Sequence, residues 1–533
     1  MPSLKAKLRS LLSKKSEVVA FSSTAIALYG YDQGMMSLIN TNYSYLSTMG
    51  IDSDSFWVGT IVSTYYIGTA LGALLSARHA DSSGRKPAIL VCELLACLGN
   101  MLMASAGFFT PRFALETMLA GRFIMGLGVG GLDAVIPVYS AELSEDDGRG
   151  RALAQEFQAN IFGLLSAFAL NLGLTHGLGK ASAVAWRVPI VSMQVYPLVL
   201  TGLIGRLPES PRWLLDKGKE ERAGRALRAM YDQDESQAEA KMEELKAAAE
   251  VESSNQKIGY GDMLLPSGAE FHPTMLTVMG QVNQALTGYG AVSVYGPQIF
   301  ELLGFSVSDS EWLTLGNYIL YFLMMTVAWL LIDRIGRRPM MVWGSVGLTG
   351  SFVLLTLLGG LADRTAIKDR SKMLAEGILG SVVLYVATSI FGIGWLSQVW
   401  LIPTEIYPSS ARAQGAAISV VVWGVANFAV TFLTPLGFNG LTYWLFLCFA
   451  VTNMFAGWWT WTYSPETGGR AFEENHAFFE KAAEVGSWRV KMVDGGRFRG
   501  MPQQGEEKNK GADEEEAGER QPLLRRVLGV GDG

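Results

Sequence analysis

The sequence predicts an all-α membrane protein whose twelve transmembrane helices form two pseudo-symmetric six-helix bundles. Three observations carry this prediction: a high apolar content, apolar runs long enough to cross a bilayer, and polar motifs that occur once in each half. Of the 533 residues, 49% are hydrophobic and 17% are charged. Soluble proteins have a more polar composition, so a lipid bilayer is the expected solvent.

The apolar runs set the number and the place of the helices. Because a helix rises 1.5 Å per residue, roughly 20 apolar residues cross the hydrocarbon core. The predicted bundles are residues 17–212 and 272–464, joined by a polar helical linker, 213–271, and flanked by tails 1–16 and 465–533, the second largely disordered in composition. The twelve predicted spans are residues 17–39, 56–77, 88–107, 113–138, 152–174, 187–206, 273–303, 312–332, 340–361, 374–401, 411–435 and 441–463.

The positions of Lys and Arg predict the orientation. The N-terminal tail carries five basic residues between Lys5 and Lys15, and basic clusters follow the second, fourth and eighth spans. We therefore expect these loops, the linker and both tails in the cytosol. One loop disagrees, because four basic residues between Arg364 and Lys372 fall on the predicted outer side. An even number of spans puts both termini on one side, and we accept this loop as an exception.

The composition also excludes several classes of function. The net charge of −6 is modest and no basic stripe is present, so nucleic acid is not an expected partner. Cys92, Cys97 and Cys448 lie inside apolar runs, which gives neither a disulfide framework nor metal-ligand spacing. No glycine-rich phosphate loop or nucleophile motif stands out, so we expect no enzymatic activity, cofactor or metal.

Three polar motifs recur, in one order, at equivalent helix ends of the two halves. Parallel repeats of six spans predict two bundles related by an axis normal to the membrane, with a solute site between them near the midplane. The matched motifs are Asp81-Ser-Ser-Gly84-Arg85-Lys86 and Asp333-Arg-Ile-Gly336-Arg337-Arg338, then Glu142 with Arg149 and Glu405 with Arg412, and finally Pro208-Glu209-Ser210 and Pro465-Glu466-Thr467.

Further motifs extend this pattern: Arg122-x3-Gly126, Arg212-Trp213 shortly after Ser210, and Pro403-x-Glu405-x-Tyr407-Pro408. Together with the repeats they resemble the motifs of the sugar porter family of the major facilitator superfamily. The resemblance runs from about residue 29 to residue 472, and the proline- and tryptophan-rich tenth and eleventh spans are similar to those of fungal members. It implies the major facilitator fold and transport of a sugar or polyol by alternating access.

Charged residues at the predicted cytosolic helix ends are candidates for an inner gate. We expect them to form charge-assisted hydrogen bonds when the cytosolic side is shut and to lose them when it opens. The alternative is that they reflect membrane topology alone. Gly84 and Gly336 are expected to supply positive φ in the tight loops. The predicted gate residues are Asp81, Arg85, Glu142, Arg149, Glu209, Arg212, Asp333, Arg337, Arg338, Glu405, Arg412 and Glu466.

Asp32 and Arg122 are ionisable residues inside predicted spans. A charged side chain there costs roughly 2.5 kcal/mol or more, which makes each a functional candidate. By helical rise they lie about 10 and 14 Å from the outer ends of their spans, so they can meet. Burial opposes ionisation of the Asp and the Arg favours it, so movement of the Arg can switch protonation. The resemblance implies the same, because a first-span Asp marks proton symporters and facilitators commonly carry Asn.

We therefore predict that Asp32 and Arg122 couple proton entry to solute entry, with a static structural pair as the alternative. Glu93, Asp133 and Glu156 are further acids in apolar runs, without a predicted role.

A sugar site needs amides for hydrogen bonds and aromatic faces for stacking, without net charge. In the register of the family, Phe157, Ala285 and Gly290 replace its amides, which indicates a pocket unlike the standard hexose site. The tryptophans have packing in the core or against lipid as their alternative role. The predicted solute-binding residues are Gln158, Gln281, Gln284, Trp400, Trp423 and Asn427.

The tail offers one further signal. Glu519, Leu523 and Leu524 have the spacing of an acidic dileucine sorting signal, which indicates a sorting adaptor as a partner. We expect the plasma membrane as the location, with a vacuolar or endosomal membrane as the alternative. The leading function is a proton-coupled symporter for a sugar or polyol. A facilitator with a structural Asp32, and a nutrient sensor that signals through its tail, are the competing functions.

Overall fold

The computed structural model describes residues 14–468 with short gaps, and a few residues of the C-terminal tail. The gaps are 54, 109–110, 144–148, 232–233, 255–257, 267, 269, 366–369 and 409–410, and the described tail residues are 479, 482, 488, 492–494 and 497–499.

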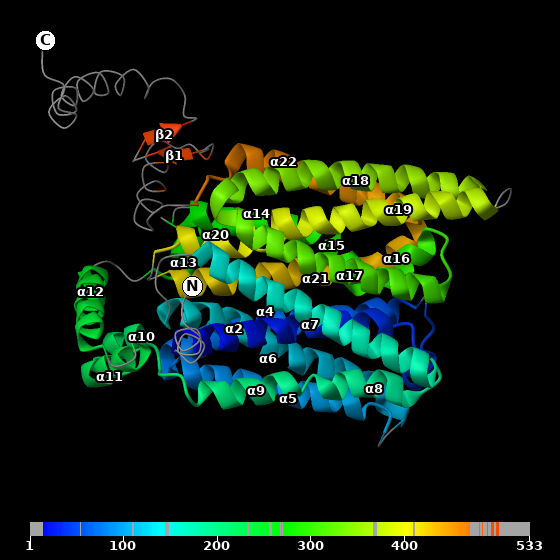
Figure 1. The fold of residues 1–533 in the computed structure, drawn as a ribbon. Coiled ribbons are helices and arrows are strands. Elements are labelled where there is room, and N and C mark those ends of the chain that lie inside the picture. The colour runs from blue at the N-terminus through cyan, green and yellow to red at the C-terminus, as the bar shows by residue number, and fades with distance from the viewer. Residues whose placement is uncertain are drawn as a thin grey trace, which may run out of the picture.

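The first half is a bundle of long helices (Figure 1). Its sixth span is divided at Met193 and Gln194 into two short helices. The helices are α2 (Lys14–Ile39), α3 (Tyr43–Met49), α4 (Phe56–Ser83), α5 (Arg85–Ser105), the 3-10 turn η1 (Pro111–Phe113), α6 (Ala114–Leu143), α7 (Arg149–Leu178), α8 (Ala183–Ser192) and α9 (Val195–Ile204).

The second half repeats this arrangement with two interrupted spans. The seventh span breaks at Gly288, whose φ of 81° ends one helix and begins the next. The tenth span contains a π-helical turn, a feature frequent at functional sites. The elements are α14 (Phe271–Leu286), α15 (Tyr289–Val294), α16 (Gly296–Leu302), α17 (Val307–Ile335), α18 (Arg337–Thr365), α19 (Arg370–Phe391), the π turn η2 (Gly392–Leu396), α20 (Gln398–Ile406), α21 (Arg412–Leu441) and α22 (Trp444–Tyr463).

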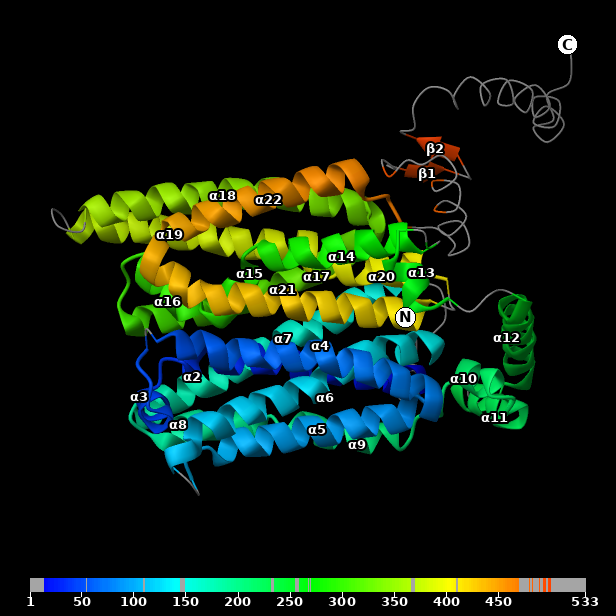
Figure 2. The ribbon, with the colours of Figure 1, turned by 180° about the vertical axis from the view of Figure 1, so that it is seen from behind.

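Each of the twelve predicted spans is therefore helical. Within the described residues, nine helices are long and apolar enough to cross a membrane. The remaining three predicted spans are α2, the broken segment α14–α16 and α22, and they run alongside the other helices (Figures 1 and 2). The expected helical membrane fold is confirmed, and the breaks within the sixth, seventh and tenth spans are what the hydropathy pattern missed.

Two long helix pairs make the most extensive contacts between the halves. α4 packs along α21, and α7 packs along α17. In the predicted repeat, the second span corresponds to the eighth and the fifth to the eleventh. The pair of spans two and eleven therefore maps onto the pair of spans eight and five, as a two-fold relation between the halves requires.

The linker forms short helices beyond one end of the bundle, which we call the linker end (Figure 1). Lys14, where the described chain begins, and Tyr463, where α22 ends, lie at this same end. A short antiparallel pair of strands follows in the tail, and its composition did not predict them. The elements are α10 (Pro211–Asp216), α11 (Glu220–Met230), α12 (Glu235–Ser254), α13 (Tyr260–Leu264), β1 (Met492–Asp494) and β2 (Arg497–Arg499).

Candidate functional site

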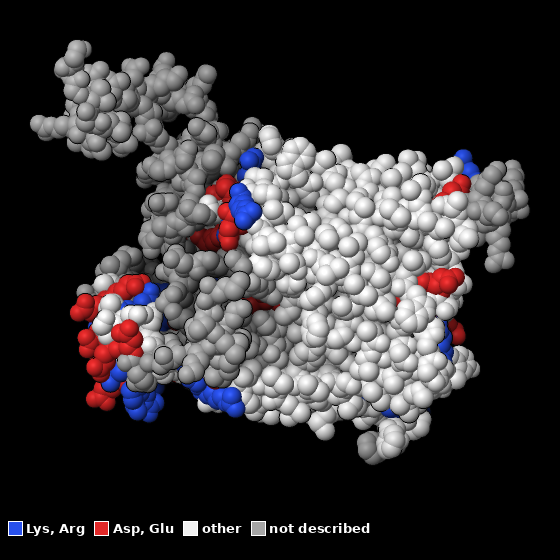
Figure 3. Space-filling view, in the orientation of Figure 1, with Lys and Arg blue, Asp and Glu red and all other residues white. Residues whose placement is uncertain are grey.

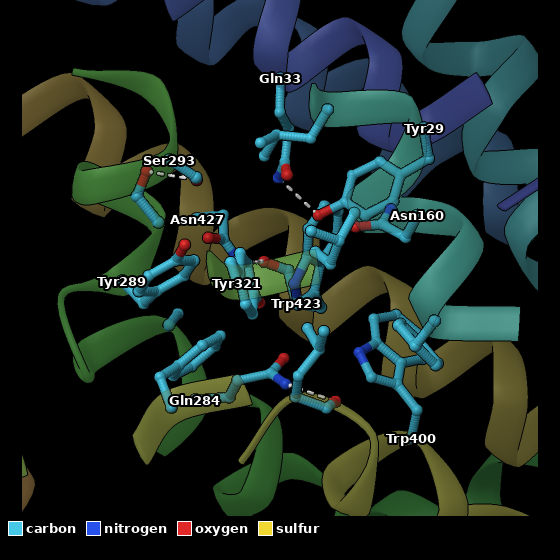
Figure 4. A pocket seen from close by; sticks show the side chains of 17 residues that line it. Tyr29, Gln33, Asn160, Gln284, Tyr289, Ser293, Tyr321, Trp400, Trp423 and Asn427 are labelled. Carbon is cyan, nitrogen blue, oxygen red and sulfur yellow. Dashed lines mark hydrogen bonds between the residues drawn. The ribbon is translucent and has the colours of Figure 1, made fainter. Parts of the chain in front are cut away.

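A cavity of about 40 Å³ lies between the two halves. This is little more than the share of one water molecule in the liquid, about 30 Å³. None of the 17 described residues that line it is charged. Its polar and aromatic lining (Figure 4) is Tyr29, Gln33, Phe157, Asn160, Gln284, Tyr289, Ser293, Tyr321, Phe391, Trp400, Trp423 and Asn427.

Trp423 of α21 is the centre of an aromatic group that reaches both halves. Its ring centroid lies 5.1 Å from that of Tyr29, 5.3 Å from that of Tyr66 and 5.9 Å from that of Trp400. The two tyrosines belong to the first half and the two tryptophans to the second. A change in the distance between the halves must therefore repack this wall.

A second aromatic group belongs to the second half alone. The break at Gly288 turns Tyr289 onto Phe391, with ring centroids 4.2 Å apart and an angle of 13° between the planes. Tyr321 meets the same tyrosine edge to face at 4.8 Å. The cavity thus has aromatic surfaces on two sides, the environment that stacks on the apolar face of a ring-shaped solute.

Four amides complete the polar lining, and backbone bonds hold three of them. Asn160 donates to the carbonyl of Ile26 at 3.2 Å, and Asn427 donates to that of Trp423 at 2.9 Å. Gln284 donates to the carbonyls of Trp395 and Leu396 at 3.2 and 3.0 Å. These two carbonyls belong to the π turn, which changes the pattern of intrahelical bonds and lets a side chain reach them.

The fourth amide, Gln33, donates to the hydroxyl of Tyr29 at 2.6 Å, and the two side chains meet at the cavity (Figure 4). Gln33 follows Asp32 directly in α2. A lining residue of the cavity is therefore the sequence neighbour of Asp32, the predicted proton-coupling carboxylate.

The structure brings four of the six predicted solute-binding residues to the cavity: Gln284, Trp400, Trp423 and Asn427. Gln158 does not line it. Its side chain points to α17, where it donates to Thr326 at 2.7 Å and accepts from the indole of Trp329 at 3.0 Å. Gln281 is fully buried and also lies outside the lining.

Sequence reasoning missed Tyr29, Gln33 and Asn160 as lining residues. A signal for Asn160 was available, because it lies one helical turn after Phe157, the position where the family carries an amide. Tyr29 and Gln33 flank the buried Asp32 on the same helix, and their four-residue spacing puts them on one face. Binding of the solute by the predicted residues that line the cavity stays a prediction.

Asp32 and Arg122 form a buried ion pair, as their depth predicts. Their side chains are 2% and 1% exposed. Arg122 also donates to the backbone carbonyls of Ile61 and Val62 at 3.2 and 3.1 Å, and its guanidinium lies 4.8 Å from the ring centre of Tyr65. The arginine therefore connects α2, α4 and α6, and the pair can act as a brace as well as a proton site.

Two further buried acids of the first half, Glu93 and Glu156, accept hydrogen bonds from hydroxyl groups. Glu93 of α5 accepts from Thr201 of α9 at 2.9 Å, which accounts for its place between those helices. Glu156 of α7 is 5% exposed and accepts from Ser140 of α6 at 3.4 Å. In both of these hydrogen bonds the partner of the carboxylate is a neutral hydroxyl group.

At the linker end of the first half, Arg85 holds a network of acids. It donates through two nitrogens to Glu142, at 2.9 and 3.1 Å, and to Asp81 at 3.1 Å. Glu209 accepts from the backbone N–H groups of Arg85 and Lys86 at 3.1 and 3.3 Å. The φ of 112° at Gly84 confirms the expected positive value.

The second half repeats this network. Arg337 donates to Glu405 at 2.7 Å and contacts Asp333 at 3.1 Å. Glu466 accepts from the backbone N–H groups of Arg337 and Arg338 at 3.0 and 3.1 Å. Gly336 has a φ of 93°, again the expected positive value.

Each of these bonds joins two residues of the same half, so the two networks brace the first and the second half separately. Arg412 begins α21 and Arg212 lies in α10, both half-buried. Arg149 begins α7, but its side chain lies outside the described residues. Between the halves, Ala73 of α4 and Ala134 of α6 pack against Val420 of α21.

At the opposite end, charged contacts do cross between the halves. Glu311 of α17 is 1% exposed and pairs with His176 at 3.0 Å and with Lys180 at 2.5 Å. Ser37 and Tyr318 share a hydrogen bond of 3.2 Å between α2 and α17. The halves therefore touch on both sides of the cavity.

The sequence of the whole helical region matches one known family. A family model described as "Sugar (and other) transporter" matches residues 18–479. The chain belongs to this family. It is therefore an integral membrane protein and a transporter, not an enzyme, and its fold is that of the major facilitator superfamily.

Relatives of known name cover most of the chain. The sugar transporter STL1 of Saccharomyces cerevisiae is 29% identical over 487 residues, which are 88% of this chain and 82% of the relative. The major myo-inositol transporter IolT of Bacillus subtilis is 29% identical over 463 residues, 86% of this chain and 92% of the relative. The fungal relative agrees with the fungal character of the tenth and eleventh spans.

The fold is also similar to that of a solved transporter. The proton:xylose symporter XylE of E. coli, in a structure with 6-bromo-6-deoxy-D-glucose, has a TM-score of 0.72. The match covers 87% of this chain and 99% of the symporter at 23% sequence identity. At this identity, the likeness establishes the architecture.

Proposed function

We propose that this sugar transporter family member is a proton-coupled symporter that carries a neutral sugar or polyol through the cavity by alternating access. The observation that carries the proposal is the buried Asp32–Arg122 pair, one residue from the cavity lining at Gln33. Burying an ion pair at about 2% exposure inside a membrane protein costs free energy. Its presence therefore favours a functional role. Coupling is a function that its position favours.

The lining favours a neutral solute with several hydroxyls. The described lining residues include no charged side chain, so a carboxylate or an ammonium group has no partner there. Amides of Gln33, Asn160 and Asn427 offer hydrogen bonds, and the groups around Trp423 and Tyr289 offer ring faces. The names of STL1 and IolT, a sugar and an inositol transporter, agree with this class.

The cavity must expand to admit such a solute. Ligand sites usually have volumes of roughly 300–1,000 Å³, and this one has about 40 Å³. The interrupted segments α14–α16 and α19–α20 supply Gln284, Tyr289 and Trp400 to the lining. Because their helices are broken near these residues, their pieces can move separately as the halves separate.

Coupling then follows from the shared helix. Protonation of Asp32 removes the partner charge of Arg122, which keeps its bonds to the carbonyls of α4. α2 is then released from α6 while Gln33 and Tyr29 remain at the solute. Proton and solute therefore act on the same helix, so that binding of one favours binding of the other.

The test is uptake by purified protein in liposomes. With an inward proton gradient, labelled sugar or polyol should accumulate above its outside concentration, and collapse of the gradient with a proton carrier should abolish the accumulation. A panel of hexoses, pentoses, polyols and cyclic acids identifies the solute class. Competition by the acids alone would contradict the neutral cavity.

A facilitator is the second candidate. The bonds of Arg122 to Ile61 and Val62 favour it, because they give the ion pair a structural role between helices. Equal uptake with and without the proton gradient, and no accumulation, would establish this alternative. For the location we propose the plasma membrane. The predicted sorting residues Glu519, Leu523 and Leu524 lie outside the described residues, as does most of the tail through which a nutrient sensor would signal.

A further inference from the structure

A groove at the linker end, separate from the cavity between the halves, carries positive charge. It has a volume of about 590 Å³ and lies where α10 and α11 meet the ends of α4, α5 and α9. Lys219, Arg222 and Arg225 line it, and all three are exposed. Among the described residues none of the three forms a salt bridge, and Lys219 lies 4.9 Å from the ring centre of Trp213. We call this site the basic groove.

Glu209 is the one acid among the described lining residues of the basic groove, and it forms no salt bridge with these cations. Glu209 accepts from the backbone N–H groups of Arg85, Lys86 and Ser210 at 3.1, 3.3 and 3.0 Å, so its charge is directed to the turn between α4 and α5. Glu220 of α11 is directed away and pairs with Lys246 of α12 at 2.6 Å.

The space-filling view agrees with this division of charge. Lys and Arg gather below α11 and at the nearby end of the bundle, whereas Asp and Glu lie on the outer side of the linker helices (Figure 3). The three cations of the basic groove lie at the end that the Lys and Arg distribution assigns to the cytosol.

The basic groove opens where lipid headgroups lie. Pro87 lines it and belongs to the first turn of α5. One to two turns further along α5, Leu90, Val91 and Leu94 are 38%, 46% and 70% exposed. Exposed leucines on a transmembrane helix face hydrocarbon, so acyl chains along α5 lead directly to the groove.

We propose that the basic groove binds the headgroup of an anionic phospholipid that carries phosphomonoester groups, as a phosphoinositide does. Lys219, Arg222 and Arg225, together with the carboxylate of Glu209, give the described lining a net charge of about +2, which matches a headgroup with several negative charges better than a singly charged one. The adjoining face of α5 holds the acyl chains, which commits the site to a lipid and not to a soluble phosphate. This goes beyond the proposed transport function and does not depend on it.

The test is native mass spectrometry of the full-length protein in detergent, titrated with short-chain lipids. The probes are a phosphatidylinositol phosphate, phosphatidylserine, phosphatidylcholine and a soluble inositol phosphate without acyl chains. The variant is Arg222→Ala with Arg225→Ala, and Lys219→Gln is an independent second variant. Arg228→Ala is the matched control, because Arg228 is exposed on the same helix but does not line the groove.

The phosphoinositide should bind most tightly to the wild type. The double variant should weaken this binding roughly 10- to 30-fold, and Lys219→Gln about 5-fold, since each cation near an anionic surface contributes measurably. The control should stay within about 2-fold of the wild type. Equal binding by the double variant, equal affinity for phosphatidylserine, or equal affinity for the soluble inositol phosphate would each overturn the proposal.

Discussion

The two halves share one architecture but pack their helices differently. In the first half, backbones touch: a Cβ added at Gly30 or Gly34 of α2 would lie 1.9 or 2.0 Å from a carbonyl oxygen of α7. In the second half such backbone contacts are fewer, although a Cβ added at Gly377 would lie 2.5 Å from the carbonyl oxygen of Leu303. Several of its glycines face side chains instead, as Gly296 faces Thr314 and Gly347 faces Ile390. Side chains can rotate away from a new neighbour and a helix backbone cannot. The first half is therefore the more rigid one, and the second half is better able to reshape.

Charge and helix continuity differ in the same direction. The buried pair of Asp32 and Arg122 belongs to the first half, whereas the two helix breaks beside the cavity, at Gly288 and at the π turn Gly392–Leu396, belong to the second. The break of the first half, at Met193 and Gln194, does not line the cavity. We infer that the first half holds the proton site in a fixed geometry and that the second half adapts to the solute. Four changes test this division, from the largest expected effect to the smallest.

Gly30→Ala should abolish most of the folded protein. The new methyl group would lie 1.9 Å from the carbonyl oxygen of Asn160, and α2 cannot move away without losing its packing on α7. Overpacking of this kind costs roughly 3 kcal/mol. Gly347→Ala is the control in the second half, because Ile390 can change rotamer. Thermal unfolding of both variants measures the effect, and equal loss in the two would contradict the difference in rigidity.

Asp32→Asn should abolish accumulation driven by a proton gradient, while counterflow of labelled solute continues. The amide imitates the neutral acid but cannot release a proton, so the driving force is lost and the cavity is kept. Some loss of stability is also expected, because Arg122 keeps a buried charge without its partner. Uptake with and without the gradient, at equal amounts of folded protein, measures this. Continued accumulation would transfer the coupling role to another acid, and Glu156 is the next to test.

Arg85→Ala and Arg337→Ala should slow turnover by about 10-fold or more, with little change in solute affinity. Each removes the cation that links the acids at the end of one half, far from the cavity lining. Conformational steps depend on such contacts, and solute contacts do not. The two variants should resemble each other, because the networks are matched. A change in solute affinity without slower turnover would contradict the role of Arg85 and Arg337 in the conformational step.

Asn427→Ala should raise KM about 5-fold and leave proton coupling intact. One neutral hydrogen bond contributes about 1 kcal/mol, and this amide lies in the adaptable half. The matched control is Asn453→Ala, since Asn453 is a buried amide of the second half that is bonded to backbone and does not line the cavity. An equal rise in KM for the control would remove Asn427 from the solute site.

Much of the architecture follows from local features of the chain. Apolar runs fix where helices form, since the bilayer requires every backbone polar group to be bonded within its own helix. The repeated motifs fix which helix ends correspond, and Arg85 and Arg337 do hold equivalent acids. The meeting of Asp32 with Arg122 also follows, because two opposite charges at similar depth have few other partners in hydrocarbon.

The tertiary structure alone decided which side chains share the cavity. Gln158 and Phe157 are neighbours in sequence, but a rotation of about 100° per residue sends Gln158 to α17 and Phe157 to the cavity. In α14 the packing likewise places Gln284 at the cavity, whereas Gln281 is buried outside the lining. A sequence shows the period of a helix, whereas the face that meets the opposite half depends on how all twelve segments pack, and that arrangement selected Tyr29, Gln33 and Asn160.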